Sequence, residues 1–291
     1  MTGSRVDRVP APLMVLVAIA SVQTGSAIAR TLFDDLGAPG VTLLRLGLAA
    51  LFLVVLLRPS VRTWSRRSWA SALLLGCVLA GMNSAFYLSL RTVPLGVAVT
   101  VEFLGPLLLA LVQTRRLLDL AWALLAGAGV ALLGLDTASG IPLSGLLLAG
   151  LAGVFWAGYI LASARVGRLL PGVDGLAVAL AVGTVLVLPF GASGALEVLN
   201  QPSLLIAAAA VALLSSIIPY GLELTALRRL PTRVFGILMS LEPAAAAIAG
   251  LVVLGQALVA RQVVALVMVS AASAGITLGR REGAPPPLPL E

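Results

Sequence analysis

About ten apolar segments alternate with short polar gaps along this chain of 291 residues, and arginine is concentrated in every second gap. Fifteen of the nineteen basic residues lie in these alternate gaps or close to the chain ends, and all nineteen are arginine. A helix needs about 20 apolar residues to cross a membrane, and arginine-rich loops stay on the cytoplasmic side. The pattern therefore predicts a multi-pass membrane protein with both termini in the cytoplasm. The basic gaps are 58–67, 115–116, 165–168, 228–233 and 280–281.

Ten predicted spans leave only short loops, so a separate soluble domain does not fit. Each span should be helical, because unpaired backbone groups in hydrocarbon cost several kcal/mol each. The predicted spans are 12–31, 38–57, 69–90, 94–114, 119–136, 143–164, 173–190, 203–226, 231–254 and 262–279. Residues 1–11 are expected to form a cytoplasmic N-terminus, and the proline-rich residues 280–291 a disordered cytoplasmic tail.

A weak internal repeat relates residues 12–136 to residues 143–279. LRTVPLGVAVTVEFLGP (90–106) aligns with LRRLPTRVFGILMSLEP (227–243) at a constant offset. Each half holds five spans, and because five is odd the second half must enter the membrane from the opposite face. We therefore predict an all-α integral membrane fold of ten transmembrane helices in two inverted five-helix repeats, an arrangement typical of transporters with a site near the midplane.

The first segment also resembles a secretory signal, because two arginines precede its apolar run and small residues follow it. Its removal would unbalance the repeat, so we interpret it as a retained helix. The net charge of +7 comes from loops beside the membrane, where arginine meets anionic lipid headgroups. We therefore expect membrane lipid, and no nucleic acid, as a partner, and we place the protein in a bacterial-type inner (plasma) membrane.

Four charged side chains inside the predicted spans are the first candidates for a site. A charge at the centre of a span costs about 2.5–3.5 kcal/mol, so such residues are retained for a function. Arg45 and Glu102 lie at similar predicted depths, and we expect an ion pair between them, with Arg45 either a structural tie or a substrate contact. Glu242 lies near the midplane without an obvious cation. Glu223 lies nearer the cytoplasm, and an interfacial ion pair with Arg228 or Arg229 is its plainer interpretation.

Three prolines lie inside predicted spans beside candidate side chains, namely Pro106, Pro219 and Pro243. A proline within a helix removes the hydrogen bond to the carbonyl four residues back. Pro106 should free the carbonyl of Glu102, which would then offer two acceptor groups to a cavity or an ion. Pro219 should free the carbonyl of Ser215.

Six further polar or aromatic residues lie within the spans: Gln23, Asn83, Tyr87, Trp156, Tyr159 and Tyr220. The first two could bind a polar solute or bond across helices, the latter for about 0.6 kcal/mol. Trp156 and Tyr159 could line a cavity or simply pack. We treat all six as secondary candidates.

The chain has no histidine and a single cysteine, Cys77, so we expect no zinc site, no other metal site and no cofactor. A proton-coupled cycle must then use a carboxylate. A buried carboxylate without a cation holds a proton more readily than one beside an arginine. We therefore expect Glu242 to be protonated more easily than Glu102. Together with Arg45, the set offers an anion for a substrate ammonium and a cation for a substrate carboxylate.

VEFLGPLLLALVQTRRLLD (101–119) and LRRLPTRVFGILMSLEPAAAAIAG (227–250) resemble the EamA-type branch of the drug/metabolite transporter superfamily. Within it, the strings are similar to the bacterial threonine/homoserine exporter family, and the resemblance runs from about residue 12 to 280. The residues that match the family motifs are Glu102, Gly105, Pro106, Glu223, Arg228, Pro231, Gly236, Glu242 and Pro243. Gln256 departs from the pattern, since EamA proteins often carry glutamate after the glycine at this point.

This resemblance implies a central cavity lined by spans one, three, four, six, eight and nine. It also implies efflux of small amino acids against inward proton movement, by alternating access, and the protein could assemble as a homodimer. An exporter of drug-like or other metabolite cargo would share the same fold. A lipid enzyme is a remote alternative, because the only acidic pair, Asp34 and Asp35, lies in an outer loop and no histidine can serve as a base. A passive channel lacks its ring of like charges.

Overall fold

The computed structural model describes residues 10–112, 117–134, 140–170, 173–227 and 229–279. Within these ranges the secondary structure is helical, and turns join the helices. Most of the predicted N-terminus and all of the predicted tail lie outside the described residues. The α-helices are α1 (Ala11–Thr31), α2 (Phe33–Leu57), α3 (Arg66–Ser89), α4 (Leu95–Glu102), α5 (Leu104–Val112), α6 (Leu117–Gly134), α7 (Leu143–Leu169), α8 (Asp174–Ala195), α9 (Pro202–Ala212), α10 (Ile218–Leu227), α11 (Thr232–Met239), α12 (Glu242–Leu254) and α13 (Ala260–Gly279).

The predicted membrane-spanning fold is confirmed. In the described part of the chain, nine helical runs are long and apolar enough to cross a membrane, and the apolar stretch Leu118–Leu133 of α6 is a shorter tenth. Two neighbouring helices together form a single span in three places: α4 with α5, α9 with α10, and α11 with α12. Large apolar side chains such as Val55 and Val185 are more than half exposed, as expected for surfaces that face lipid.

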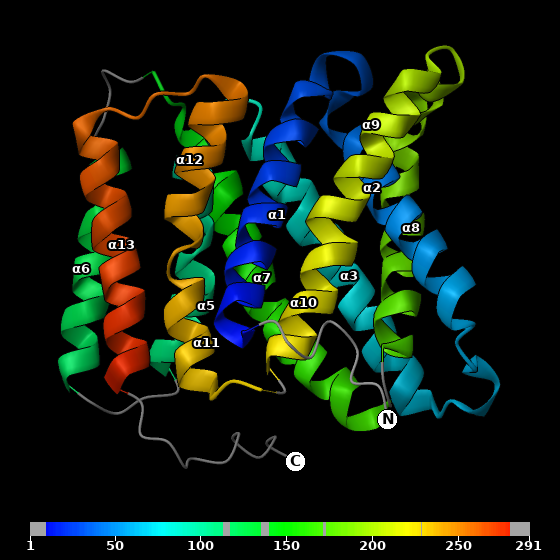
Figure 1. Ribbon diagram of the computed structural model, residues 1–291, viewed down its shortest axis with the longest axis horizontal. Coiled ribbons are helices and arrows are strands. Elements are labelled where there is room, and N and C mark those ends of the chain that lie inside the picture. Colours follow the sequence, from blue (N-terminus) through cyan, green and yellow to red (C-terminus); the bar gives the residue numbers. More distant parts are fainter. Residues whose placement is uncertain (1–9, 113–116, 135–139, 171–172, 228, 280–291) are drawn as a thin grey trace.

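The helices stand side by side in one bundle, and the connections between them lie at its two ends (Figure 1). The start of α1 and the end of α13 lie at the lower end, together with the connections from α2 to α3, from α7 to α8 and from α10 to α11. The α2–α3 connection carries Arg58 and Arg62, and α3 opens with Arg66 and Arg67. The described basic gaps therefore share one end of the bundle, as the alternation of the arginines predicts.

Helices of the first half pack against their counterparts in the second half. α2 lies against α8 and α6 against α13. The contact between α3 and α7 has its counterpart in the contact between α10 and α1. In the same way, the contact of α1 with α12 corresponds to the contacts of α7 with α4 and α5. α1 rises from the lower to the upper end of the bundle in Figure 1, whereas α7 runs down to the lower end. Two inverted five-helix repeats would produce this pairing.

Helical irregularities occur at all three of the prolines singled out from the sequence. The run containing Pro106 breaks at Phe103, between α4 and α5, and the run containing Pro243 breaks between α11 and α12. A π-helical segment, η5 (Leu213–Ile217), precedes Pro219. Each irregularity lies on the N-terminal side of its proline, where the missing N–H leaves a carbonyl free. The helices are thus interrupted near Pro106 and Pro243, whereas at Pro219 the helix continues through a π-helical turn.

Candidate functional site

Arg45 is a buried guanidinium in the apolar interior, 6% exposed, on α2. Its Nη1 donates to the hydroxyl of Tyr87 on α3 at 3.1 Å, and Nη2 donates to the carbonyl oxygen of Ser215 at 2.9 Å. Nε donates to Oγ of Ser216 at 3.3 Å. The guanidinium also lies 5.4 Å from the centroid of the Tyr87 ring. Arg45 therefore joins two helices of the first half to the π-helical segment of the second half.

Local backbone geometry explains why the Ser215 carbonyl is available to Arg45. In a regular helix this oxygen would accept from the residue four positions later, which is Pro219 and has no N–H. The π-helical turn Leu213–Ile217 carries this residue into the interior, where Ser215 and Ser216 are 2% and 1% exposed. A buried carbonyl without a partner is costly, and the charged donor satisfies it. The bond from Arg45 agrees with the prediction that Pro219 frees this carbonyl.

Glu102 and Glu242 lie at the two helix breaks, on opposite sides of them. Glu102 is the last residue of α4 and is 8% exposed, while Glu242 is the first residue of α12 and is 6% exposed. α4 and α12 pack against each other. The first turn of α12 also places Glu242 at the positive end of a helix dipole, which favours a negative charge or an acceptor there.

Electrostatic interactions connect six side chains into one group, which we name the central polar cluster. Its members are Arg45, Glu102, Tyr159, Tyr220, Glu223 and Glu242. Glu242 interacts with both Glu102 and Glu223, and Arg45 interacts with Glu102 and Tyr220. The members come from α2, α4, α7, α10 and α12, and so from both halves of the chain.

The predicted ion pair between Arg45 and Glu102 is not a direct contact in the described structure: the guanidinium bonds to the hydroxyls and carbonyl of α3 and η5, and its charge acts on Glu102 without a hydrogen bond. α2 packs mainly on α8 and α3, whereas α4 packs on α12 and α7. Glu223 is partly buried and interacts with Tyr159, Tyr220 and Glu242. Arg228, one of its two predicted partners, lies outside the described residues. The three carboxylates have no hydrogen bond or ion pair to any described residue.

The aromatic candidates divide into those that face the charges and those that pack. Tyr87 is fully buried against Phe33 and Phe86, with ring centroids 5.7 and 5.9 Å away, and its hydroxyl accepts from Arg45. Tyr87 is thus a positioning residue for the guanidinium. Trp156 packs edge-on against Phe103 at the α4–α5 break, with centroids 5.5 Å apart. Tyr159 and Tyr220 belong to the central polar cluster.

The two amide candidates, Gln23 and Asn83, behave differently. Asn83 is 3% exposed, and its Nδ2 donates to the Leu79 carbonyl of its own helix at 2.8 Å, so the predicted bond across helices is replaced by a local one. Gln23 on α1 is 4% exposed, and its Oε1 is buried without a hydrogen-bond partner in the described structure. Buried polar atoms are normally satisfied. Gln23 therefore remains a candidate for substrate binding, whereas the side-chain amide of Asn83 already donates to a carbonyl of its own helix.

The backbone carbonyl of Glu102, which the sequence predicts to be free, lies at a close contact between helices. It lies against Gly153 of α7, where a Cβ on residue 153 would collide with the carbonyl oxygen. A Cβ on Gly105 would likewise collide with the Gly153 backbone. Two glycines thus let α5 and α7 approach at backbone distance, as small residues do in membrane bundles.

Gln256, the departure noted in the sequence, has a defined structural role. Its Oε1 accepts from the backbone N–H of Leu95, the first residue of α4, at 2.9 Å. The first N–H groups of a helix lack partners within it, and Pro94 provides no side-chain cap. Gly255, in the left-handed conformation with φ of 66°, ends α12 and turns the chain so that Gln256 reaches α4.

Two serines of the site, Ser216 and Ser240, were not singled out from the sequence, and for Ser215 only its carbonyl was. Ser215 and Ser216 hold Arg45, and Ser240 at the α11–α12 break donates to Ser273 of α13 at 3.2 Å. The available signal was the pair of adjacent serines four residues before Pro219 and Tyr220. Serine is common in packed membrane helices, so this signal becomes informative only when the proline is considered with it.

No group of three or more His, Cys, Asp or Glu residues with metal-binding geometry occurs among the described residues. Two grooves of about 790 Å³ each lie on the outside of the bundle beside α2, away from the central polar cluster. The site is therefore a buried set of charges without an organised metal centre in the described part.

Comparison with known proteins identifies the family. The EamA-like transporter family model matches residues 143–278. Threonine/homoserine exporter RhtA of Salmonella typhimurium (strain LT2) is 44% identical over 274 residues, covering 93% of this chain and 92% of that protein. The chain belongs to the EamA-like transporter family. This EamA transporter is likewise 44% identical to threonine/homoserine exporter RhtA of Escherichia coli (strain K12) over 273 residues, with the same coverage.

A solved structure described as "Crystal structure of protein" has the same fold as this EamA transporter. Its TM-score is 0.61, with 22% sequence identity and coverage of 92% of this chain and 96% of that chain. The family and the bundle of apolar helices together establish an integral membrane transporter, not an enzyme. The sequence-based assignment to the EamA branch is confirmed.

Proposed function

We propose that this transporter exports small amino acids resembling threonine and homoserine, in exchange for protons, by alternating access. The relatives named as threonine/homoserine exporters supply the substrate class. The observation that carries the chemistry is the central polar cluster, in which three carboxylates and one fixed guanidinium lie together and no carboxylate is ion-paired to a described residue. An amino acid zwitterion carries the complementary pair of charges.

Arg45 is suited to hold the substrate carboxylate. A guanidinium has five N–H donors, and three of them are used on Tyr87, Ser215 and Ser216. One N–H remains on each of Nη1 and Nη2, and a carboxylate accepts from such a pair in a bidentate arrangement. The bonds to α3 and η5 fix the orientation of the guanidinium before substrate arrives, which reduces the entropy cost of binding.

The carboxylates supply the coupling between substrate and proton. Three carboxylates in one buried cluster cannot all be ionised at low cost, because like charges repel and burial disfavours the charged forms. Glu242 interacts with both Glu102 and Glu223, so a proton or a substrate ammonium on one of the three relieves the repulsion. Competition of the two cations for the same carboxylates produces antiport, since the bound proton must leave when substrate binds.

Alternating access would follow from motion of one half against the other. We propose that the halves are inverted repeats, which the paired packing of α2 with α8 and of α6 with α13 supports. The breaks at Phe103 and at Ser240–Leu241 provide points where α4 and α12 can tilt separately from α5 and α11. The arginine-rich end of the bundle faces the cytoplasm in this proposal, and the membrane is the bacterial inner membrane.

Counterflow in proteoliposomes tests the proposal. Vesicles containing the full chain are preloaded with threonine, and uptake of labelled threonine is measured with and without a pH gradient. We expect saturable exchange that responds to the gradient, and loss of the gradient response in Glu102→Gln and Glu242→Gln. Glu197→Gln is the matched control, because Glu197 is exposed in the short 3-10 helix Leu196–Leu199 and its side chain bonds locally, to Asn200 at 3.0 Å.

Two outcomes would contradict the proposal. Normal gradient-driven exchange in both Glu102→Gln and Glu242→Gln would show that these carboxylates do not couple protons to transport. Saturable exchange of amphiphilic compounds, with none of any amino acid, would overturn the substrate class while leaving the fold intact. Comparable yields of folded, membrane-inserted protein for all variants are required in either case.

A further inference from the structure

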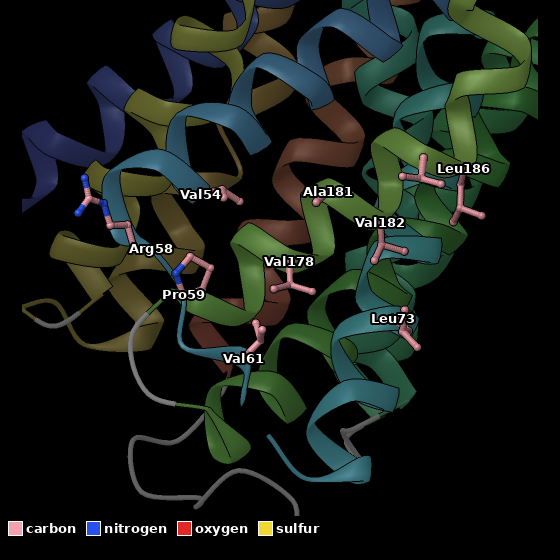
Figure 2. Close-up of a pocket in the computed structure, with 10 residues that line it drawn as sticks. Val54, Arg58, Pro59, Val61, Leu73, Val178, Ala181, Val182 and Leu186 are labelled. Carbon is pink, nitrogen blue, oxygen red and sulfur yellow. The ribbon is translucent and has the colours of Figure 1, made fainter. Parts of the chain in front are cut away.

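Two apolar grooves flank the C-terminal half of α2 and share one charged residue, Arg58. The first, of about 790 Å³, lies between α2, α3 and α8 and is lined by side chains such as Val54, Val178 and Val182. Figure 2 shows Arg58 and Pro59 at the edge of this groove, with the valines lining it. The second, also of about 790 Å³, follows the outer face of α2 from Leu48 to Arg58.

The backbone at Arg58 fixes the end of α2 beside both grooves. Arg58 adopts a left-handed conformation with φ of 47°, the single non-glycine residue with positive φ in the described ranges. Its N–H donates to the Val54 carbonyl at 2.9 Å and closes the last turn, and Pro59 prevents the helix from continuing. The Arg58 side chain is exposed, with no hydrogen bond or ion pair to a described residue. A positive charge thus stands unneutralised where the two grooves meet.

The length of the grooves matches one leaflet of a bilayer. Residues 48 to 58 of α2 span about 15 Å at 1.5 Å per residue. The hydrocarbon core of a bilayer is about 30 Å thick, so one leaflet contributes about 15 Å. Both grooves therefore run from the arginine-bearing end of the bundle towards the midplane, over the depth that an acyl chain of that leaflet occupies.

We propose that this site binds an anionic phospholipid, with its phosphate at Arg58 and its acyl chains in the two grooves. Arg62, Arg66 and Arg67 add positive charge at the same end of the bundle, and no acidic residue occurs between Asp35 and Glu102. The apolar lining suits hydrocarbon and not a polar solute. The charge argues against a second copy, because a twofold dimer in a membrane pairs residues at equal depth and would bring the arginine clusters together.

Lipid binding to the purified full-length protein tests the site. Delipidated protein in detergent is titrated with phosphatidylglycerol or with phosphatidylcholine of the same acyl chains, and bound lipid is counted by native mass spectrometry. We expect a preference for phosphatidylglycerol that falls about fivefold in Arg58→Gln, the effect of one basic residue at headgroup level, and that survives in Arg58→Lys. Arg168→Gln is the matched control, an exposed arginine near the same end that lines neither groove.

A second variant tests the grooves independently of the charge. Val185 lines the first groove and is 66% exposed, so Val185→Trp fills the groove without disturbing the core. We expect this variant to bind less of either lipid. Equal binding of both lipids, or an unchanged preference in Arg58→Gln, would overturn the proposal. A dimeric wild type that Val185→Trp converts to monomer would show that a second copy occupies the groove, and would overturn it as well.

Discussion

Replacing Gly153 with alanine tests whether the backbone contact between α7 and the α4–α5 break holds Glu102 in place. A Cβ at residue 153 would collide with the Glu102 carbonyl oxygen and would lie 3.2 Å from the Gly105 nitrogen. Both neighbours are backbone atoms, so no side-chain rotation can relieve the overlap. Gly150, three residues earlier on α7, offers a matched control, because its nearest neighbour to an added Cβ is a Val101 methyl at 4.0 Å.

The size of the effect follows from two opposing contributions. Alanine stabilises a helix relative to glycine by about 0.5–1 kcal/mol, and this gain is common to Gly153→Ala and Gly150→Ala. Overpacking a tight contact costs about 1–3 kcal/mol, and only residue 153 incurs this cost. The gain cancels in the comparison, so Gly153→Ala should be about 1–3 kcal/mol less stable than Gly150→Ala.

The same displacement should affect transport. Relief of the overlap must move the α4–α5 break away from α7, and this movement carries the Glu102 carboxylate with it. We expect a higher KM for threonine counterflow in Gly153→Ala and an unchanged KM in Gly150→Ala. Unfolding of the purified proteins in a denaturing detergent gives the stability difference. Equal stability and equal KM for the two variants would refute the contact and the role that we assign to it.

Two further predictions concern residues that tie separate helices together. Gln256→Ala should lower stability by about 0.5–2 kcal/mol, the usual cost of losing a helix cap, because the N–H of Leu95 loses its acceptor. Gln256→Glu should restore most of this stability. Thermal unfolding of the wild type and the two variants measures both differences. Arg45→Lys should lose exchange activity although the charge remains, because an ammonium cannot reach Tyr87, the Ser215 carbonyl and a substrate carboxylate together. Wild-type counterflow in Arg45→Lys would contradict the role assigned to the guanidinium geometry.

The elements that local chemistry controls were predictable from the sequence. The span predicted at 143–164 corresponds to α7 at Leu143–Leu169, and that at 262–279 to α13 at Ala260–Gly279. The break near Pro106 follows from the missing N–H of that residue alone. The convergence of Glu102 and Glu242 was also foreseeable, because buried charges in a membrane protein gather at one interior site.

Partner choice within the site was decided by the tertiary structure. The depth of Arg45 and Glu102 along their helices placed them at the same level, but depth says nothing about the direction in which a side chain points. The π-helical turn Leu213–Ile217 brings the Ser215 carbonyl to the guanidinium, and this geometry depends on how η5 packs between α1 and α2. The backbone contact that holds the Glu102 carbonyl is likewise a product of packing.

The number of membrane crossings (about ten), the basic end of the bundle and the places where its helices break could all be predicted from the amino-acid sequence. These properties depend on residues close together in the chain and on the cost of exposing polar groups to lipid. The acceptors that hold Arg45 and the carbonyl that contacts Gly153 follow from the packing of the helices in space. Side-chain partners are set by helix rotation and packing, and these depend on contacts between residues more than a hundred positions apart, as between Arg45 and Ser216, which are 171 apart.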